Sequence, residues 1–195
     1  MNDDKMKTAS KAEETEKRTP LQSAYDWIEI IGVSLAAVLL FLTFFARITT
    51  VIGESMLPTL HEGERLFVVC FGYEPEKGDI VVVQDDRSVI DYPIVKRIIA
   101  TGGDTVEFDF ENWTVQVNGI TLEEDYINKI DFVGMRSYGC AGKLTVPEGY
   151  VFVMGDNRNN STDSRDSRVG FVSNDDVIGK VAFRIAPINK FGKVN

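Results

Sequence analysis

The chain has 195 residues, with 30 acidic side chains, 21 basic ones and a single histidine, so its net charge is −9. No run of Lys or Arg occurs beyond residue 47, which argues against a nucleic-acid partner. One histidine and two widely spaced cysteines do not form the usual ligand set of a zinc site, so we expect no metal and no other cofactor.

Three regions are predicted in chain order. Residues 1–26 form a disordered tail, because their Lys, Glu, Thr and Ser content leaves too little apolar surface to fold alone. Residues 27–48 form a transmembrane anchor. Residues 49–195 form one β-rich domain, which is long enough to bury its own core.

The predicted anchor is based on Ile30–Ala46, a continuous uncharged stretch of mostly large apolar residues. As a helix this stretch is about 25 Å long, and Trp27 and Ile48 extend it towards the membrane interfaces. A cleaved secretory signal is the alternative, but its apolar region is usually only about 7–15 residues long. A cleavage site after Ala46 would also place the bulky Phe44 where a small residue is required. A retained anchor is therefore favoured.

Basic residues flank the anchor unequally. Lys11, Lys17 and Arg18 precede it, whereas Arg47 is the one basic residue close behind it. Cytoplasmic flanks carry the excess of Lys and Arg, so the tail is predicted to be cytoplasmic. The chain would then cross the bilayer once, with its β-rich domain outside the cytoplasm.

Beyond the anchor, short β-branched and apolar runs alternate with turn signals, which is typical of strands. Asn118-Gly119 is a strong hairpin signal, and no convincing amphipathic helix is found. The predicted strands are Leu66–Phe71, Ile80–Gln84, Ile94–Ala100, Thr105–Phe110, Thr114–Val117, Tyr150–Met154 and Val181–Ile185. The predicted fold is mostly β: an antiparallel sheet domain outside the cytoplasm, behind a single N-terminal transmembrane helix.

Ser55 follows the anchor closely and is a candidate nucleophile placed just outside the membrane. A serine hydroxyl needs a base within hydrogen-bond reach. His61 lies in the polar segment 61–64, where a solvent-exposed turn residue is the better interpretation. A Ser-His-Asp triad is therefore nearly excluded, and lysine is the remaining base.

Lys96 is the candidate base, because it lies in the apolar run Tyr92–Ala100. Lysine accepts a proton only when neutral, and burial among apolar groups can lower its pKa by about 3–5 units. Strand alternation places Lys96 and Arg97 on opposite faces, so one of them faces inwards or towards a site. An exposed edge strand with Lys96 in solvent is the alternative, and this segment alone does not decide between the two.

The polar segment Met154–Arg165 directly follows an apolar strand. It can supply a hydroxyl to a lysine amine, and Asp–Arg pairs to fix the loop. A calcium loop is excluded because Arg158 occupies the third ligand position and the required Gly and Glu are missing. A flexible surface loop is the other alternative, although the arginines beside the acids favour order.

These three segments, in this order behind an N-terminal anchor, resemble those of the bacterial type I signal peptidases, which are membrane-bound serine/lysine proteases. Residues 55–60, Ser-Met-Leu-Pro-Thr-Leu, are similar to the nucleophile box of that family. Lys96-Arg97 with Gly103-Asp104 is similar to the lysine box, and the segment 155–165 to the C-terminal box. The resemblance covers the chain from the anchor to near its C-terminus.

The resemblance implies a role for each matching residue. Ser55 would attack the scissile carbonyl, and its N–H would form part of the oxyanion hole. Neutral Lys96 would take the Ser55 proton and return it to the leaving amine. Ser161 would orient the Lys96 amine, and Asp163 with Arg165 would brace that arrangement.

The chain departs from the family pattern at three places. Some members carry a serine hydroxyl in the oxyanion hole where this chain has Gly53, so a backbone-built or water-assisted hole is implied. The lysine box more often reads Leu-Pro-Gly-Asp at 101–104, and the C-terminal box often carries Asp in place of Asn159. Neither of these last two positions is expected to take part in the chemistry.

The implied substrates are secretory preproteins with small residues, often alanine, at positions −1 and −3 of the cleavage site. Val51, Met56, Leu60 and Val95 flank the candidate catalytic residues and are expected to line shallow apolar pockets. The substrate would bind as an added strand. The implied location is the bacterial cell membrane, where the lipid bilayer is the second partner and the domain 49–195 is catalytic.

The sequence offers two alternative functions. A related Ser/Lys protease could cleave itself or one dedicated client, but no Ala-Gly or Cys-Gly bond lies between the anchor and Ser55. An inactive membrane-tethered β-domain that binds secreted chains would be expected to lose Ser55 or Lys96. Whether Cys70 and Cys140 form a disulfide stays open at this point, and the segment 125–142 has no functional interpretation.

Overall fold

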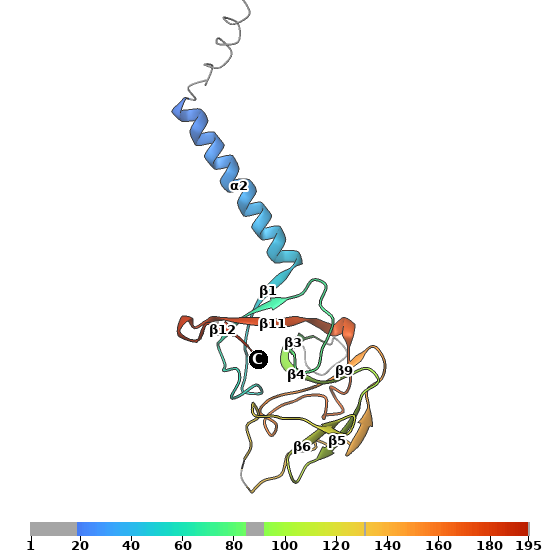
Figure 1. Cartoon of the computed structure of the whole chain (residues 1–195). Coiled ribbons are helices and arrows are strands. Elements are labelled where there is room, and N and C mark those ends of the chain that lie inside the picture. The colour runs from blue at the N-terminus through green and yellow to red at the C-terminus, as the bar shows by residue number, and fades with distance from the viewer. Residues whose placement is uncertain (1–18, 85–91, 131, 195) are drawn as a thin grey trace, which may run out of the picture. The chain divides into compact units, whose positions relative to one another are not determined.

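The computed structural model describes residues 19–84, 92–130 and 132–194. The chain divides into two compact units, residues 1–42 and 43–195. A helix makes up most of the described part of the first unit, and the regular elements of the second are mainly strands (Figure 1).

Helix α2 spans Pro20–Phe44 and begins earlier than the predicted anchor. Its start is a capping box, in which Thr19 Oγ1 accepts from the Gln22 N–H at 3.2 Å and Gln22 Oε1 accepts from the Thr19 N–H at 2.9 Å. Pro20 suits the first helical position, where an N–H has no intrahelical partner. Residues 20–26, predicted to belong to the tail, are therefore helical.

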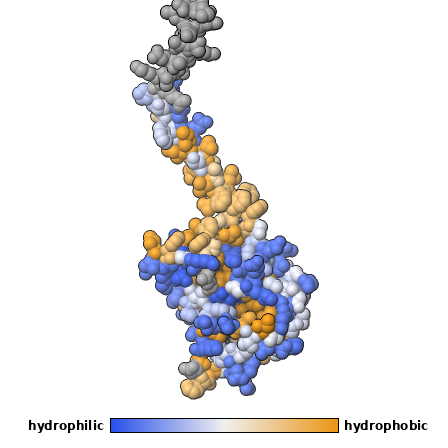
Figure 2. All heavy atoms as spheres, in the orientation of Figure 1, coloured by the Kyte–Doolittle hydropathy of each residue, from blue (hydrophilic) through white to orange (hydrophobic). Residues whose placement is uncertain are grey.

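The surface of α2 is predominantly apolar towards its C-terminal end (Figure 2). The helix is long and apolar enough to cross a membrane, and none of its side chains is buried. After Phe44 the chain becomes extended and forms β1, Ala46–Thr50. The last residues of the predicted anchor, 46–48, thus lie in a strand, consistent with the β-branched residues that follow Arg47.

The main sheet has eight antiparallel strands, seven of them in the order β1-β2-β11-β3-β4-β9-β10, while β12 pairs with β11. Its other strands are β2 (Arg65–Val69), β3 (Ile80–Val83), β4 (Ile94–Thr101), β9 (Tyr150–Met154), β10 (Val172–Ser173), β11 (Val177–Ala186) and β12 (Gly192–Lys193). All four residues of β3 are buried, because the sheet has a core on each face. Ile80 and Val82 pack into one apolar cluster, and Val81 and Val83 into another.

A smaller sheet has the order β7-β6-β5-β8. Its strands are β5 (Thr105–Asp109), β6 (Thr114–Val117), β7 (Ile120–Thr121) and β8 (Lys143–Thr145). Asn118 and Gly119 join β6 to β7 with φ values of 54° and 78°, as the predicted hairpin requires. Two short 3₁₀ helices, η1 (Asn174–Asp176) and η2 (Ile188–Lys190), complete the described elements.

The predicted mostly β, antiparallel fold is confirmed, and all seven predicted strands are present. The one expected at Val181–Ile185 begins earlier, at Val177. The strands that were not predicted, β1, β7, β8, β10 and β12, are short and have five residues or fewer. Cys70 and Cys140 are both free thiols, which answers the disulfide question.

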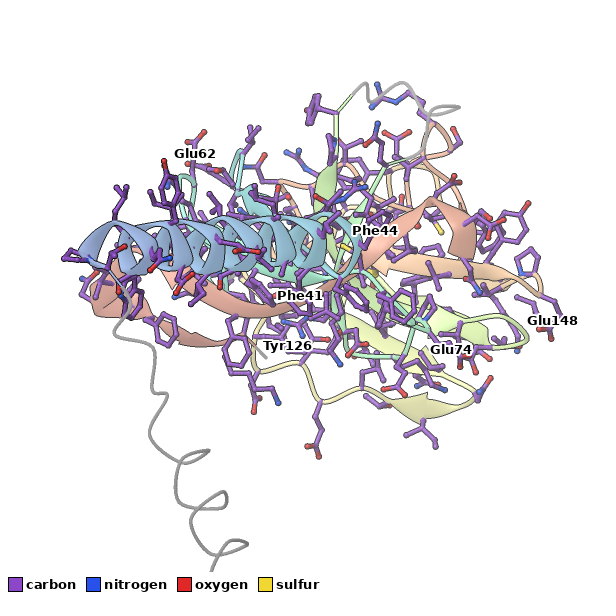
Figure 3. The ribbon with its side chains drawn as sticks, turned by 90° about the horizontal axis from the view of Figure 1, so that it is seen from above. Phe41, Phe44, Glu62, Glu74, Tyr126 and Glu148 are labelled. Carbon is purple, nitrogen blue, oxygen red and sulfur yellow. The ribbon has the colours of Figure 1, made fainter. Side chains whose placement is uncertain are left out.

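The turn between β4 and β5 packs against the turn that precedes β9, where Glu148 lies (Figure 3). A Cβ on Gly102 would lie 3.0 Å from Glu148 Cα, and Gly103 has a φ of 82°. This close approach explains why glycine occupies position 102, at which the resembled family more often has proline.

Candidate active site

The candidate nucleophile lies in a closed loop between β1 and β2. The Val51 N–H donates to Glu64 O and the Gly63 N–H to Val51 O, each at 2.9 Å, so the two ends of the loop are held together. Met56, next to Ser55, is buried in the apolar core and anchors the loop there. These contacts hold Ser55 in a fixed position.

Lys96 lies on a central strand, because β4 pairs with β3 on one side and with β9 on the other. The alternative of an exposed edge strand is therefore wrong. The register places Lys96 opposite Val81, and Ile98 on the same face packs into the same apolar cluster as Val81. Only 3% of Lys96 is exposed.

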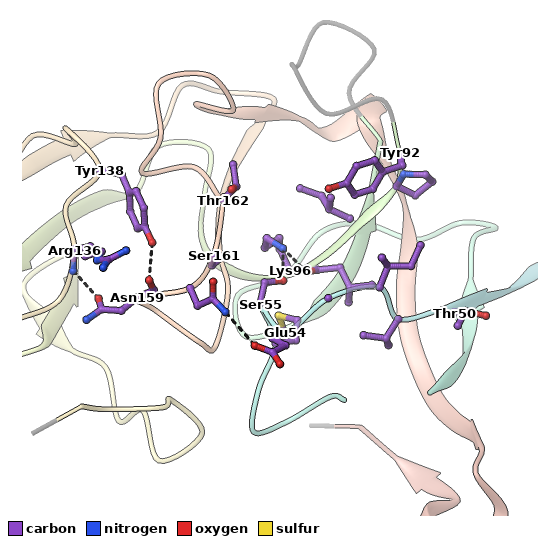
Figure 4. Close-up of a pocket in the computed structure, with 18 residues that line it drawn as sticks. Thr50, Glu54, Ser55, Tyr92, Lys96, Arg136, Tyr138, Asn159, Ser161 and Thr162 are labelled. Carbon is purple, nitrogen blue, oxygen red and sulfur yellow. Dashed lines mark hydrogen bonds between the residues drawn. The ribbon is translucent and has the colours of Figure 1, made fainter. Parts of the chain in front are cut away.

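The two candidate catalytic side chains are in direct contact (Figure 4). Lys96 Nζ donates to Ser55 Oγ at 2.7 Å and to Val95 O at 2.9 Å. Burial lowers the pKa of Lys96 from 10.5 to about 8, against the opposing effect of the Asp163 and Asp156 carboxylates. A neutral amine at this position can accept the Ser55 proton.

Arg97 is also buried, but on the opposite face of β4. Its guanidinium forms a two-point pair with Asp156 at 2.9 and 2.8 Å, and it stacks 3.9 Å over the Tyr126 ring. Asp156 also accepts from the Thr59 hydroxyl at 2.5 Å. One carboxylate thus links the segments that hold Ser55 and Lys96 to a third segment, residues 155–166, which we call the catalytic loop.

The catalytic loop is ordered by a second buried pair. Arg165 Nε and Nη2 donate to the Asp163 carboxylate at 2.9 and 2.8 Å, and both side chains are inaccessible to solvent. Asp163 also accepts from the Gly155 N–H at 3.0 Å. The alternative of a flexible surface loop is therefore wrong.

Ser161 lines the cavity beside Lys96 but does not bond to its amine in this structure. Its hydroxyl is buried and has no hydrogen-bond partner among the described residues. The expected bond from Ser161 to Lys96 therefore stays a prediction.

Asn157 attaches the loop between β1 and β2, which carries Ser55, to the catalytic loop. Its N–H donates to Ser55 O at 3.0 Å and its Nδ2 to Glu54 O at 3.1 Å. Asn157 and Asp156 were not singled out from the sequence. Their position inside a polar segment after a strand was the available signal.

A cavity of about 410 Å³ opens at the Ser55–Lys96 contact. Its described lining residues are Thr50, Val51, Ile52, Gly53, Glu54, Ser55, Met56, Tyr92, Pro93, Ile94, Val95, Lys96, Arg136, Tyr138, Asn159, Asn160, Ser161 and Thr162. Three of the four predicted pocket residues, Val51, Met56 and Val95, are among them. Leu60 is not: it is fully buried in the core and lies outside the cavity.

The backbone around Ser55 has a free donor. Among the described residues, no acceptor binds the Ser55 N–H, which is therefore available to an oxyanion in the cavity. Gly53 lines the same cavity with a φ of 78°, a conformation that disfavours a side chain. The arrangement combines a nucleophile, a buried base and a backbone donor, which suits acyl transfer.

The comparisons with known proteins agree on one family. The model for "Signal peptidase, peptidase S26" matches residues 24–186. Signal peptidase I of Bacillus licheniformis is 37% identical over 180 residues, which covers 89% of this chain and 94% of that protein. Signal peptidase I T of Bacillus subtilis (strain 168) is 36% identical over 192 residues, with 94% and 97% covered.

A crystal structure of a signal peptidase I from Enterococcus faecalis V583 is also similar, with 32% sequence identity and a TM-score of 0.46. That alignment covers 56% of this chain and 97% of the other. Ser55, Lys96 and the catalytic loop all lie inside the segment that the family model matches.

Proposed function

Because this chain belongs to the signal peptidase family, peptidase S26, we propose that it is a membrane-anchored endopeptidase that removes N-terminal signal peptides with a Ser55–Lys96 dyad. The observation that carries the proposal is the 2.7 Å contact between Lys96 Nζ and Ser55 Oγ at a cavity. The substrates would be secreted preproteins, and the chemistry needs no metal or other cofactor.

In the proposed mechanism, Lys96 first loses its proton to solvent and then acts as general base. With a pKa of about 8, roughly one Lys96 in ten is neutral at pH 7, whereas at 10.5 only about one in three thousand would be. Ser55 Oγ attacks the scissile carbonyl as its proton moves to Nζ. The lysine then returns that proton to the leaving amine as the peptide bond breaks. In the second half of the reaction Lys96 takes a proton from the attacking water and gives it to Ser55 Oγ as the ester bond of the acyl-enzyme breaks.

The tetrahedral intermediate would be stabilised by the free N–H of Ser55. Gly53 brings no hydroxyl to this position, so the second donor would be another backbone group or a water molecule. Ser161 and the Asp163–Arg165 pair would hold the lysine amine in place. The buried Asp163–Arg165 contacts support a bracing role, because they fix the loop that carries Ser161.

The shape of the cavity supports an extended substrate with small side chains. Ile94 and Val95 of β4 lie before Arg97, the first β4 residue paired with β9, so this end of the strand is open on that side. A substrate backbone can pair there as an added strand. Val51, Met56 and Val95 contribute apolar side chains to the cavity lining, which would suit small apolar residues at positions −1 and −3.

The anchor would be α2, with the tail cytoplasmic and the domain from residue 49 onwards outside the cell membrane. The length and apolar surface of α2 support the spanning role. The excess of basic residues before it supports the orientation. Such an anchor would hold Ser55 near the membrane surface, where a translocated preprotein presents its cleavage site.

Cleavage of a preprotein by the detergent-solubilised chain tests the proposal, with the new N-terminus identified by mass spectrometry. Ser55→Ala should abolish cleavage, and Lys96→Ala should reduce it by at least about 100-fold. Lys143→Ala, at an exposed lysine in β8, is the matched control and should cleave normally. Normal cleavage by a folded Lys96→Ala variant would rule out the dyad.

A further inference from the structure

The segment 134–138 is fixed to the catalytic loop at both sides of Arg136. Asn159 Nδ2 donates to Gly134 O at 3.1 Å, and Asn159 Oδ1 accepts from the Arg136 N–H at 2.7 Å. Arg165 Nη1 donates to Arg136 O at 2.9 Å. Both backbone polar groups of Arg136 are therefore bound by the loop that also carries Ser161.

The side chain of Arg136, unlike its backbone, is not held by the catalytic loop. It is exposed, it lines the cavity, and its guanidinium forms no hydrogen bond or ion pair with any described residue. By contrast, Arg97 and Arg165 are buried and each forms a two-point pair with an aspartate. Because its backbone is fixed and its guanidinium is unpaired at the cavity, Arg136 is available to bind a group that enters there.

Among the described residues that line the cavity, Arg136 is the one with a permanent positive charge. Lys96, the other base among those residues, must be neutral to work. Glu54 is their one carboxylate, and it accepts from Asn160 Nδ2 at 3.3 Å. The guanidinium therefore attracts an anionic group that enters the cavity on its side.

The cavity has two chemically different ends on either side of the dyad. Arg136 and Tyr138 lie on one side of Ser55, and Tyr92 and Thr50 lie on the other (Figure 4). The side of Thr50 also holds the apolar Val51, next to it in the chain. If the small residues before the scissile bond occupy that apolar side, the chain after the bond passes Arg136.

We propose that Arg136 is a specificity-determining residue that binds an acidic side chain of the preprotein within the first few residues after the scissile bond. This inference rests on the proposed function and adds a subsite for the part of the substrate that leaves as the mature protein. Exposed ion pairs are weak, so the expected preference in kcat/KM is about two- to fivefold.

The experiment measures kcat/KM of the full-length chain in detergent with preprotein peptides that differ at one residue. Glu, Gln or Lys is placed in turn at each of the first four positions after the scissile bond. We expect Glu to be cleaved faster than Gln, and Lys more slowly, at one position at least, with the preference weakened at high salt.

Variants at Arg136 separate the subsite from general effects of charge. Arg136→Gln should bring the kcat/KM ratio of the Glu and Gln peptides to about one, and Arg136→Glu should reverse the preference. Lys143→Gln makes the same change of charge in the smaller sheet and should keep the preference. Equal rates for Glu, Gln and Lys in the wild type, or a preference that survives Arg136→Gln, would overturn the inference alone. If the wild type cleaves none of the peptides, the proposed function fails as well.

Discussion

Replacing Lys96 by methionine should raise the folding stability of the protein at neutral pH. A lysine whose pKa falls from 10.5 in the unfolded chain to about 8 in the folded one makes the folded state less stable by about 3 kcal/mol at pH 7. Methionine fills a similar volume without a charge, but it loses the hydrogen bonds to Val95 O and Ser55 Oγ. The buried bond to Val95 O is worth about 1 kcal/mol, whereas Ser55 lines the cavity, where water can replace the amine. The expected net gain is about 2 kcal/mol.

The sign of the pH dependence follows from proton binding. Between about pH 8 and 10.5 the unfolded wild type binds more protons than the folded one, so wild-type stability rises with pH in this window. The loss of folding stability caused by Lys96 therefore has its full size below about pH 8 and has mostly disappeared by about pH 10. The advantage of Lys96→Met should therefore shrink from about 2 kcal/mol to near zero as the pH rises.

Chemical denaturation of both proteins at pH 7 and pH 10 measures this difference. All other titratable groups are the same in both proteins, so their effects cancel in the comparison. Ser55→Ala is the control, because it removes the nucleophile but keeps the buried amine and should follow the wild-type pH dependence. An advantage of Lys96→Met that is absent, or is the same at both pH values, would contradict a buried lysine of lowered pKa.

Three further outcomes are expected. The pH–rate profile of kcat/KM should rise through an apparent pKa near 8, and a rise only near pH 10 would show that Lys96 is not desolvated in solution. Gly155→Ala should lower kcat by about 100-fold, because the new Cβ would lie 2.5 Å from Ser55 O; unchanged turnover would contradict the close packing. Asn159→Asp should lower the free energy of unfolding by about 1–3 kcal/mol, since a carboxylate cannot donate to Gly134 O; equal stability in thermal unfolding would argue against that bond.

The strands that hold the site could be predicted because each has a strong local pattern. Apart from Lys96 and Arg97, the run 94–100 is apolar and rich in β-branched residues, so a strand there could be predicted without knowledge of its neighbours. What the pattern does not give is the pairing of that strand. Lys96 in the middle of an edge strand and Lys96 between β3 and β9 have the same sequence, and only the pairing of distant segments distinguishes them.

Arg97 illustrates a second limit. Strand alternation predicts that Lys96 and Arg97 face opposite sides, and that one of them faces inwards or towards a site. Both are buried, because Asp156 provides a partner for the guanidinium on the second face. A buried charge is tolerated where a partner meets it, and that partner lies 59 residues away along the chain.

Asn159 shows how a departure from the family pattern can be explained by its surroundings. Aspartate, frequent at this position in the resembled family, offers only acceptors when ionised, whereas asparagine also offers two N–H donors. Here the amide uses both kinds of atom, accepting from the Arg136 N–H and donating to Gly134 O. The choice of asparagine is thus matched to the segment 134–138, which had no interpretation in the sequence. Asn159 thus joins the segment 134–138 to the catalytic loop at the cavity, so the proposed specificity after the scissile bond and the proposed role of Ser161 would both depend on this side chain.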